Sequence, residues 1–285
     1  MEKIILDTSL TSTKPSYNVF AELQQRIVQS TEQEVELHVD IEKRLGLSFL
    51  FCISTLPIFA KSRGKDIHIF CNSKSLMLFK WNRYIPDDSS LSEKDDIAPF
   101  LHKSSRCITA EADSVYELVT EITSDAPVKM SENLAALFTS KVGEMYNNSL
   151  EHSEGQYVIG GKYFKNQKGI YCFSCYDTGI GIPQKVKNSI DDGLSETAAF
   201  QWAMQRGHST ANKTAENKVP RGLGLGLLRS FAKANEGTIR ICSGKVLYIY
   251  RPKKGSQYFE LENKFEGTLF EMDIIADDQH KYVLG

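Results

Sequence analysis

"KVGEMYNNSLEHSEG", residues 141–155, is unusually polar for a segment with helical spacing. Glu144, Asn148 and His152 lie four residues apart, so a helix would project all three side chains from one face. Asparagine is a middling helix former that competes with the backbone for hydrogen bonds, so helix stability does not explain its presence. The pattern indicates either a binding face or a solvated helix surface.

A second polar segment, "DTGIGIP" at residues 177–183, directly follows an expected strand. Gly179 and Gly181 allow the backbone to turn tightly and allow a ligand to approach it closely. Asp177 places a carboxylate at the end of the strand. The segment is interpreted either as part of a binding site or as a plain turn.

A third segment, "RGLGLGLLRSFAKANEG" at residues 221–237, has three glycines that alternate with leucines before a helix. They are Gly222, Gly224 and Gly226. Backbone amides at the start of a helix suit an anion such as phosphate, although helix packing would also explain the glycines. The spacing matches neither the P-loop nor the Rossmann fingerprint, which disfavours both of those nucleotide folds.

The N-terminal region alternates between strand-like and helix-like apolar patterns, which predicts a β-α-β-α-β-α order. The expected elements are, in order, residues 3–7, 17–30, 35–40, 45–60, 66–72 and 75–81. The polar segment 82–99 contains two prolines and shows neither the helical nor the strand periodicity of apolar residues. This composition indicates a domain boundary. We therefore expect an N-terminal α/β domain at residues 1–95 and a second domain at residues 96–285.

The second domain has a different order of elements, in which helices come first and strands follow. The expected helices are 114–122, 132–152, 196–207 and 223–235, and the expected strands are 156–165, 169–177 and at least three more near the C-terminus. This order predicts an α+β fold, with helices on one face of a mostly antiparallel sheet.

Several functional classes are disfavoured by the sequence. The apolar run Leu45–Ala60 falls short of the about 20 apolar residues of a membrane span, so it predicts a buried helix that ends or kinks near Pro57. The N-terminus lacks the features of a signal peptide, and we expect a cytoplasmic protein. The net charge of -2 implies neither nucleic-acid nor membrane binding. Cys172 and Cys175 would lie on opposite faces of a strand, which disfavours a redox or zinc role.

Taken together, these segments resemble the GHKL superfamily of ATP-binding domains, the Bergerat fold found in gyrase, sensor histidine kinases and the mismatch-repair protein MutL. The family has an N box (E-x-x-x-N-x-x-x-[HKR]), a G1 box (D-x-G-x-G), a G2 box (G-x-G-x-G-L) and a late G-T. The matching residues are Glu144, Asn148 and His152; Asp177, Gly179 and Gly181; Gly222, Gly224, Gly226 and Leu227; and Gly267 and Thr268. The resemblance covers residues 108–275 and implies a Bergerat sandwich that binds ATP and Mg²⁺.

The resemblance also implies roles for individual side chains. Asn148 would ligate Mg²⁺, Glu144 would orient or deprotonate an attacking water or hydroxyl, and His152 would meet a phosphate. Asp177 would accept a hydrogen bond from the adenine amino group, and Thr268 would help through the base or a bound water. Glu144 is thus the expected catalytic residue, and Asn148 the expected metal ligand.

The resemblance implies that the glycine-rich segment contacts the phosphates of the nucleotide, and that Leu223 and Leu225 take part in this contact. It also implies that residues 205–222 form a lid that closes over the phosphates. The lid segment is poor in apolar residues, which suits a mobile loop. Its candidate phosphate contacts are Ser209, Thr210, Lys213 and Arg221. A solvated loop with incidental charges remains the alternative for each of these four.

The resemblance favours a Mg²⁺-dependent switch that binds and hydrolyses ATP. Its nucleotide state would control the lid and the contacts with protein partners in a signalling or defence-type system. The alternative is a protein kinase that acts on serine, or on histidine, of a partner. A purely structural nucleotide site is a third reading, against which Glu144 argues. The N-terminal order loosely resembles a STAS-like partner-binding domain, and the family resemblance allows a homodimer.

Overall fold

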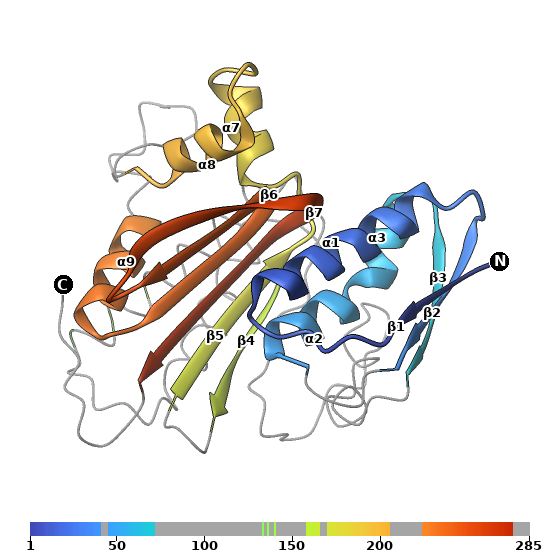
Figure 1. Ribbon diagram of the computed structural model, residues 1–285, viewed down its shortest axis with the longest axis horizontal. Coiled ribbons are helices and arrows are strands. Elements are labelled where there is room, and N and C mark those ends of the chain that lie inside the picture. Colours follow the sequence, from blue (N-terminus) through green and yellow to red (C-terminus); the bar gives the residue numbers. More distant parts are fainter. Residues whose placement is uncertain are drawn as a thin grey trace.

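The computed structural model describes residues 1–40, 45–71, 133, 136, 140, 158–165, 170–205 and 224–275. These residues form two β-sheets, with helices α1 and α2 lying between them (Figure 1). Both helices and strands are well represented, so the predicted α+β class is confirmed at this level.

The N-terminal sheet consists of three parallel strands in chain order, β1 (Glu2–Leu6), β2 (Glu34–Val39) and β3 (Asp66–Cys71). Helix α1 (Lys14–Gln29) connects β1 to β2. The predicted alternation of strands and helices is therefore confirmed as far as β3. The predicted helix 75–81 and the predicted domain boundary lie outside the described residues.

The apolar run that was predicted as one buried helix forms two short ones, α2 (Leu47–Ser54) and α3 (Leu56–Ser62). Pro57 lies in the first turn of α3, where a helix does not need the N–H group that proline lacks. The predicted break near Pro57 is therefore confirmed. Across the described part of the chain, we find no helix with the length and apolar character needed to span a membrane.

The second sheet is antiparallel, as predicted, and has the strand order β4-β5-β7-β6. Its strands are β4 (Val158–Lys165), β5 (Ile170–Asp177), β6 (Thr238–Arg251) and β7 (Gly255–Ile275). Strands β6 and β7 are much longer than the other two, so they continue past the sheet as a two-stranded ribbon.

Helices cover this sheet on both faces, whereas the sequence predicts helices on one face only. Helix α9 (Gly224–Ala234) lies on the face that carries Ile274, because a Cβ at Gly237, just after α9, would be 3.0 Å from Ile274 Cγ2. Helices α1 and α2 cover the opposite face, as Figure 1 shows. The second cover comes from a distant part of the chain, which local sequence patterns do not reveal.

Two further helices, α7 (Ile182–Ser189) and α8 (Glu196–Ala203), follow strand β5. The hydroxyl of Ser195 caps α8 by accepting a hydrogen bond from the Ala198 N–H at 3.1 Å. The ring of Phe200 packs on Tyr248 of the β6–β7 ribbon, with ring centroids 6.3 Å apart. Helix α8 is thereby held against the ribbon.

Cys172 and Cys175 lie on opposite faces of β5, as predicted. The thiol of Cys172 donates to Asp273 Oδ1 at 2.8 Å, and Cys175 lies opposite Phe270 on the other face. Four cysteines are buried and form no disulfide, namely Cys52, Cys172, Cys175 and Cys242. The described ranges contain no cluster of His, Cys, Asp and Glu side chains that could hold a metal ion.

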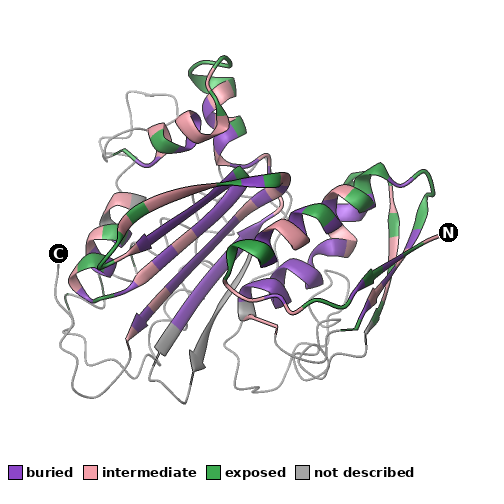
Figure 2. Cartoon of the chain, in the orientation of Figure 1, coloured by how far each residue is buried: buried purple, intermediate pink, exposed green. Residues whose placement is uncertain are grey.

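A single hydrophobic core joins the N-terminal helices to the second sheet, as the buried residues in Figure 2 show. The ring of Phe20 in α1 lies 5.7 Å from that of Phe265 in β7, and Tyr176 in β5 meets Phe265 edge-on at 5.9 Å. Burial of such side chains is the main favourable term in folding. The two predicted domains therefore pack directly against each other.

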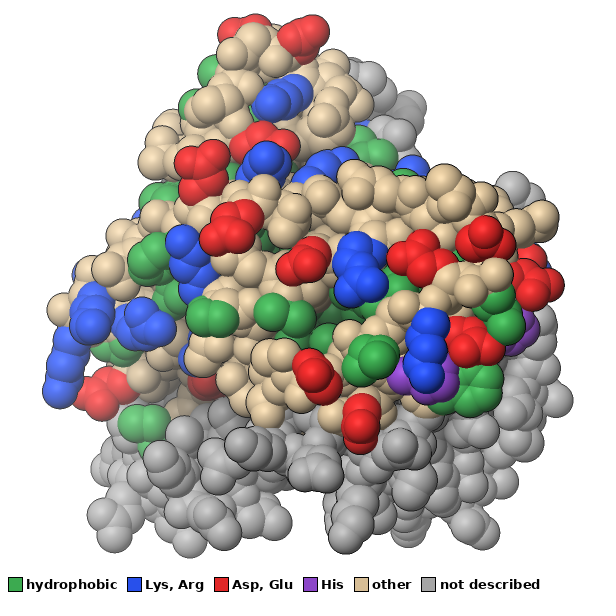
Figure 3. Space-filling view, turned by 45° about the vertical axis from the view of Figure 1, so that its right-hand side comes forward, with side chains coloured by type: hydrophobic (Ala, Val, Ile, Leu, Met, Phe, Trp, Pro, Cys, Tyr) green, Lys and Arg blue, Asp and Glu red, His purple; other side chains and the backbone are tan. Residues whose placement is uncertain are grey.

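Many charged side chains lie on the surface of the molecule. On the face drawn in Figure 3, acidic and basic side chains are interspersed and do not gather by sign. This arrangement agrees with the nearly balanced formal charge of -2.

Glu271 is the main polar residue within the buried contact. Its carboxylate is only 5% exposed and accepts hydrogen bonds from the hydroxyls of Ser12, Tyr17 and Ser48, the first at 3.0 Å. A buried carboxylate is costly unless it is fully hydrogen-bonded, and these donors come from the N-terminal region. Burial, together with the adjacent Glu271 charge, raises the pKa of Tyr17 well above its usual value of about 10.

Removal of the Tyr17 hydroxyl by Tyr17→Phe is expected to lower the free energy of unfolding by about 1–2 kcal/mol at neutral pH, because Glu271 stays buried with one donor fewer. Urea denaturation measures this loss. The matched control is Tyr248→Phe, which breaks a 2.9 Å contact with Ser256 and leaves Glu271 unchanged. An equal loss in both variants would contradict the special role of the buried carboxylate.

The raised pKa of Tyr17 also predicts a pH dependence. Above pH about 10 the unfolded chain releases the tyrosine proton while the folded chain retains it, so the stability contributed by Tyr17 is lost as the pH rises toward its folded pKa. Between about pH 9 and pH 11, the unfolding free energy of the wild type should therefore fall more steeply than that of Tyr17→Phe. Parallel slopes in urea titrations would count against this assignment.

Candidate functional site

Two of the predicted site residues, Asp177 and Thr268, meet where β5 ends against β7. Asp177 is the last residue of β5, is 3% exposed and lies opposite Thr268 of β7. Thr268 in turn lies opposite Ser243 of β6. Three adjacent strands therefore bring a carboxylate and two hydroxyls together, as the resemblance predicts for Asp177 and Thr268.

Asp177 also shapes the turn that follows it. Its Oδ1 atom accepts a hydrogen bond from the Gly179 N–H at 3.0 Å, which closes a tight turn directly after the strand. The next residue after Asp177, Thr178, has a buried hydroxyl oxygen with no hydrogen-bond partner among the described residues. A buried polar atom of this kind is a group that a bound ligand or water would satisfy.

Ser243 links the first turn of α7 to strand β7. Its hydroxyl oxygen lies 2.9 Å from the Gly267 carbonyl, to which it donates, and 3.2 Å from Thr268 Oγ1. It also accepts a hydrogen bond from the Ile182 N–H at 2.9 Å. The sequence analysis did not select Ser243, because its role depends on the pairing of β6 with β7 and no local motif marks it.

Two glycines of the predicted motifs occupy positions that other residues would strain. Gly181 has φ 84°, and a Cβ there would lie 2.7 Å from Ser243 Oγ. Gly267 has φ 86°, and its Cβ would lie 2.0 Å from the Asp177 carbonyl oxygen. Both glycines are therefore required for the close approach of strands and turn around Asp177.

The G2 glycines lie partly within the described residues. Helix α9 begins at Gly224, one residue after the predicted start, so Gly224 and Gly226 both lie in its first turn. A Cβ at Gly226 would meet no described atom within 4 Å, so packing against these residues does not explain the glycine. Leu225 is also in the first turn of α9.

Most of the other predicted site residues lie outside the described residues and stay predictions. They are Glu144, Asn148, His152, Ser209, Thr210, Arg221, Gly222 and Leu223. The expected catalytic residue and the expected Mg²⁺ ligand are both in this group. The described part of the predicted site therefore comprises the region assigned to the base and the start of α9.

The described residues place one carboxylate and two hydroxyl groups near the end of β5. The Asp177 carboxylate can accept a hydrogen bond from an exocyclic amino group, and the Thr178 and Thr268 hydroxyls can act as donors or acceptors toward ring nitrogens or a bridging water.

Comparison of the sequence with protein-family models gives no match, and comparison with curated proteins gives none either.

Gly267→Ala is expected to lower the free energy of unfolding by about 3 kcal/mol or more, because the new methyl group would displace the Asp177 backbone. The control is Gly255→Ala, where φ is also positive at 68° but a Cβ would meet no atom within 4 Å. That control isolates the backbone cost, which is about 1 kcal/mol. Similar losses in urea denaturation would mean that the close approach to Asp177 carries no strain.

Proposed function

We propose that this protein is a Mg²⁺-dependent ATP-binding and ATP-hydrolysing switch of the GHKL type. The observation that carries the proposal is the buried Asp177 at the end of β5, in register with Thr268 and enclosed by two glycines of positive φ, Gly181 and Gly267. These four residues belong to the G1 motif and the late G-T motif of the sequence. Their convergence supports the proposed adenine pocket.

The architecture around the pocket supports the Bergerat sandwich. An antiparallel sheet carries Asp177 and Thr268 at one end, and α9 lies on one of its faces. The first turn of α9 holds Gly224 and Gly226, and backbone amides at the start of a helix suit phosphate oxygens. In the proposed arrangement, the base lies by Asp177 and the phosphates extend toward the start of α9.

The catalytic part of the proposal relies on the predicted N box. Asn148 would hold Mg²⁺, which offsets the phosphate charge when bound. Glu144 would accept a proton from an attacking water, and His152 would contact a phosphate. Ser209, Thr210 and Arg221 of the proposed lid would contact the phosphates after closure. The state of the lid would then alter contacts with a protein partner.

Asp177→Asn is expected to weaken ATP binding about tenfold or more, because an amide presents a donor where the adenine amino group needs a charged acceptor. The amide oxygen can still accept the Gly179 N–H, so the turn should persist. Equilibrium dialysis with labelled ATP measures the dissociation constant. Asp191→Asn is the matched control, because Asp191 forms the same kind of turn with the Gly193 N–H at 2.9 Å on the exposed surface.

Incubation with Mg²⁺ and γ-labelled ATP tests the catalytic part of the proposal. Wild-type protein should release phosphate without becoming labelled, and Glu144→Ala, Asn148→Ala or removal of Mg²⁺ with a chelator should abolish the release. The Asp191→Asn variant should behave as the wild type. Transfer of label to this chain or to an added partner would replace the ATPase by a protein kinase, and a wild type that binds no nucleotide would overturn the pocket assignment.

A further inference from the structure

Strand β7 contains a bulge directly beside the proposed adenine pocket. Its pairing with β6 steps from Thr268, opposite Ser243, to Phe265, opposite Gly244, so Glu266 and Gly267 have no counterparts in β6. On the other side of β7, the pairing with β5 ends at Thr268. The backbone N–H and C=O of Glu266 therefore belong to neither ladder, although backbone groups withdrawn from water need partners.

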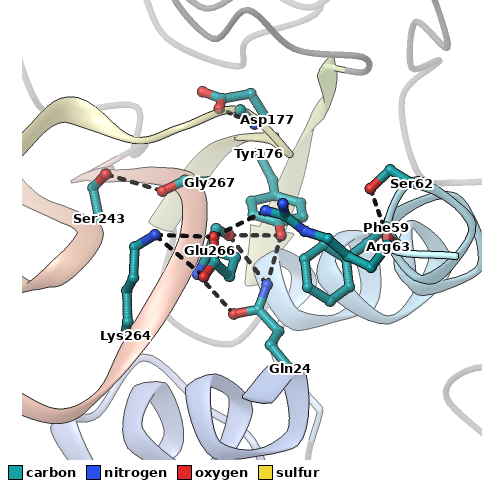
Figure 4. Close-up of polar contacts among 11 residues, drawn as sticks. Gln24, Phe59, Ser62, Arg63, Tyr176, Asp177, Ser243, Lys264, Glu266 and Gly267 are labelled. Atoms are coloured by element: carbon teal, nitrogen blue, oxygen red, sulfur yellow. Dashed lines mark hydrogen bonds and ion pairs between the residues drawn. The ribbon is translucent and has the colours of Figure 1, made fainter. Parts of the chain in front are cut away.

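Gln24 of helix α1 supplies those partners, as Figure 4 shows. Its Oε1 atom accepts the Glu266 N–H at 3.0 Å, and its Nε2 atom donates to the Glu266 carbonyl at 3.1 Å. The same Nε2 atom donates to the Tyr176 hydroxyl at 2.9 Å, and that hydroxyl donates to the Glu266 carbonyl at 3.0 Å. One side-chain amide thus takes the place of a neighbouring strand.

The position of Gln24 on its helix indicates that these bonds, rather than packing, explain the residue. Gln24 is 0% exposed and lies on the buried side of α1, where Tyr17, Phe20 and Ile27 are also buried. An apolar side chain would pack there without the desolvation cost of an amide. The amide is favourable only because its oxygen and nitrogen are both hydrogen-bonded to the bulge.

Other contacts to Glu266 are more exposed. Arg63 of the N-terminal region forms a 3.3 Å ion pair with the Glu266 carboxylate, and Lys264 forms one at 3.2 Å. The Arg63 side chain is 44% exposed, and ion pairs in such positions contribute little. Gln24 therefore supplies the buried hydrogen bonds between the N-terminal region and Glu266, beside the ring contact of Phe20 with Phe265.

We propose that Gln24 is a positioning residue for the nucleotide site, an inference that rests on the proposed function. Gln24 holds Glu266, which is two residues before Thr268, and Tyr176, which directly precedes Asp177. A single amide therefore fixes both strands immediately beside the two residues that face the base. The N-terminal region in this way completes a site to which it contributes no ligand.

The test compares ATP and GTP dissociation constants in Gln24→Met, which keeps the volume of the side chain and removes its amide. Looser strands should misplace Asp177 relative to Thr268, so ATP binding should weaken about tenfold and the preference for ATP over GTP should fall by a similar factor. A general loss of folded protein would lower the fraction of active molecules without changing this ratio. Tyr176→Phe, which removes only the hydroxyl and keeps the ring, should give a smaller change in the same direction.

Hydrogen exchange in the nucleotide-free protein provides the second readout. Backbone amides of residues 266–268 should exchange about tenfold faster in Gln24→Met than in the wild type. The matched control is Asn18→Ala, because Asn18 is on the same helix and its Oδ1 atom accepts the Glu262 N–H of β7 at 3.1 Å. That contact lies farther from Thr268 along the strand, so the control should leave the ratio of affinities unchanged.

The outcomes separate this inference from the proposed function. An unchanged ATP-to-GTP ratio in Gln24→Met overturns the inference even if exchange becomes faster, because Gln24 would then be purely structural. An equal change of the ratio in Asn18→Ala overturns it as well. A wild type that binds neither nucleotide overturns the proposed function and the inference together, whereas normal wild-type binding with no effect of Gln24→Met overturns the inference alone.

Discussion

Within the second sheet, strand β7 is covered on both faces, so its buried polar groups must find partners inside the protein. The apolar residues of β7 meet this constraint by packing, as Phe270 and Met272 do on the α9 face and Leu269 does on the α1 face. The Glu271 carboxylate accepts hydrogen bonds from three hydroxyl groups of the N-terminal region. The backbone N–H of Glu266 donates to the side chain of Gln24. The position of the N-terminal helices follows from these requirements, because they carry the donors and acceptors that β7 lacks.

This constraint connects the two sides of the sheet. Thr268 faces the proposed adenine pocket, whereas the neighbouring Leu269 belongs to the core shared with α1 and α2. Alternation along a strand makes such neighbours face opposite ways, so a shift of β7 moves both sides at once. The glycine at 267 brings the Asp177 backbone so close that β5 and β7 must move together. Contacts of the N-terminal region with β7 can therefore change the relative positions of Asp177 and Thr268 in the proposed adenine pocket.

Local patterns predicted most of the described elements, although helix α7 was not among them. Alternating apolar runs predicted β1, α1, β2 and β3, and Pro57 marked the break between α2 and α3. The G1 motif placed Asp177 at a strand end, and the late G-T motif selected a glycine whose φ is positive. Gln24 left a weaker signal, a polar residue at an apolar position of an amphipathic helix, which became informative only once the bulge in β7 was known.

The sequence by itself indicated the type and approximate place of most described strands and helices, the antiparallel second sheet, and the motif residues Asp177, Gly181 and Gly267. These features depend on the spacing of residues that are close in sequence. Over such short stretches, the geometry of a helix or strand alone decides which side chains share a face. Only the tertiary structure decided that α1 and α2 cover the back of the second sheet, that Ser243 joins Thr268, and that Gln24 pairs with Glu266. Those contacts join residues far apart in the chain, and they form because buried backbone and carboxylate groups of β7 must be hydrogen-bonded once water is excluded.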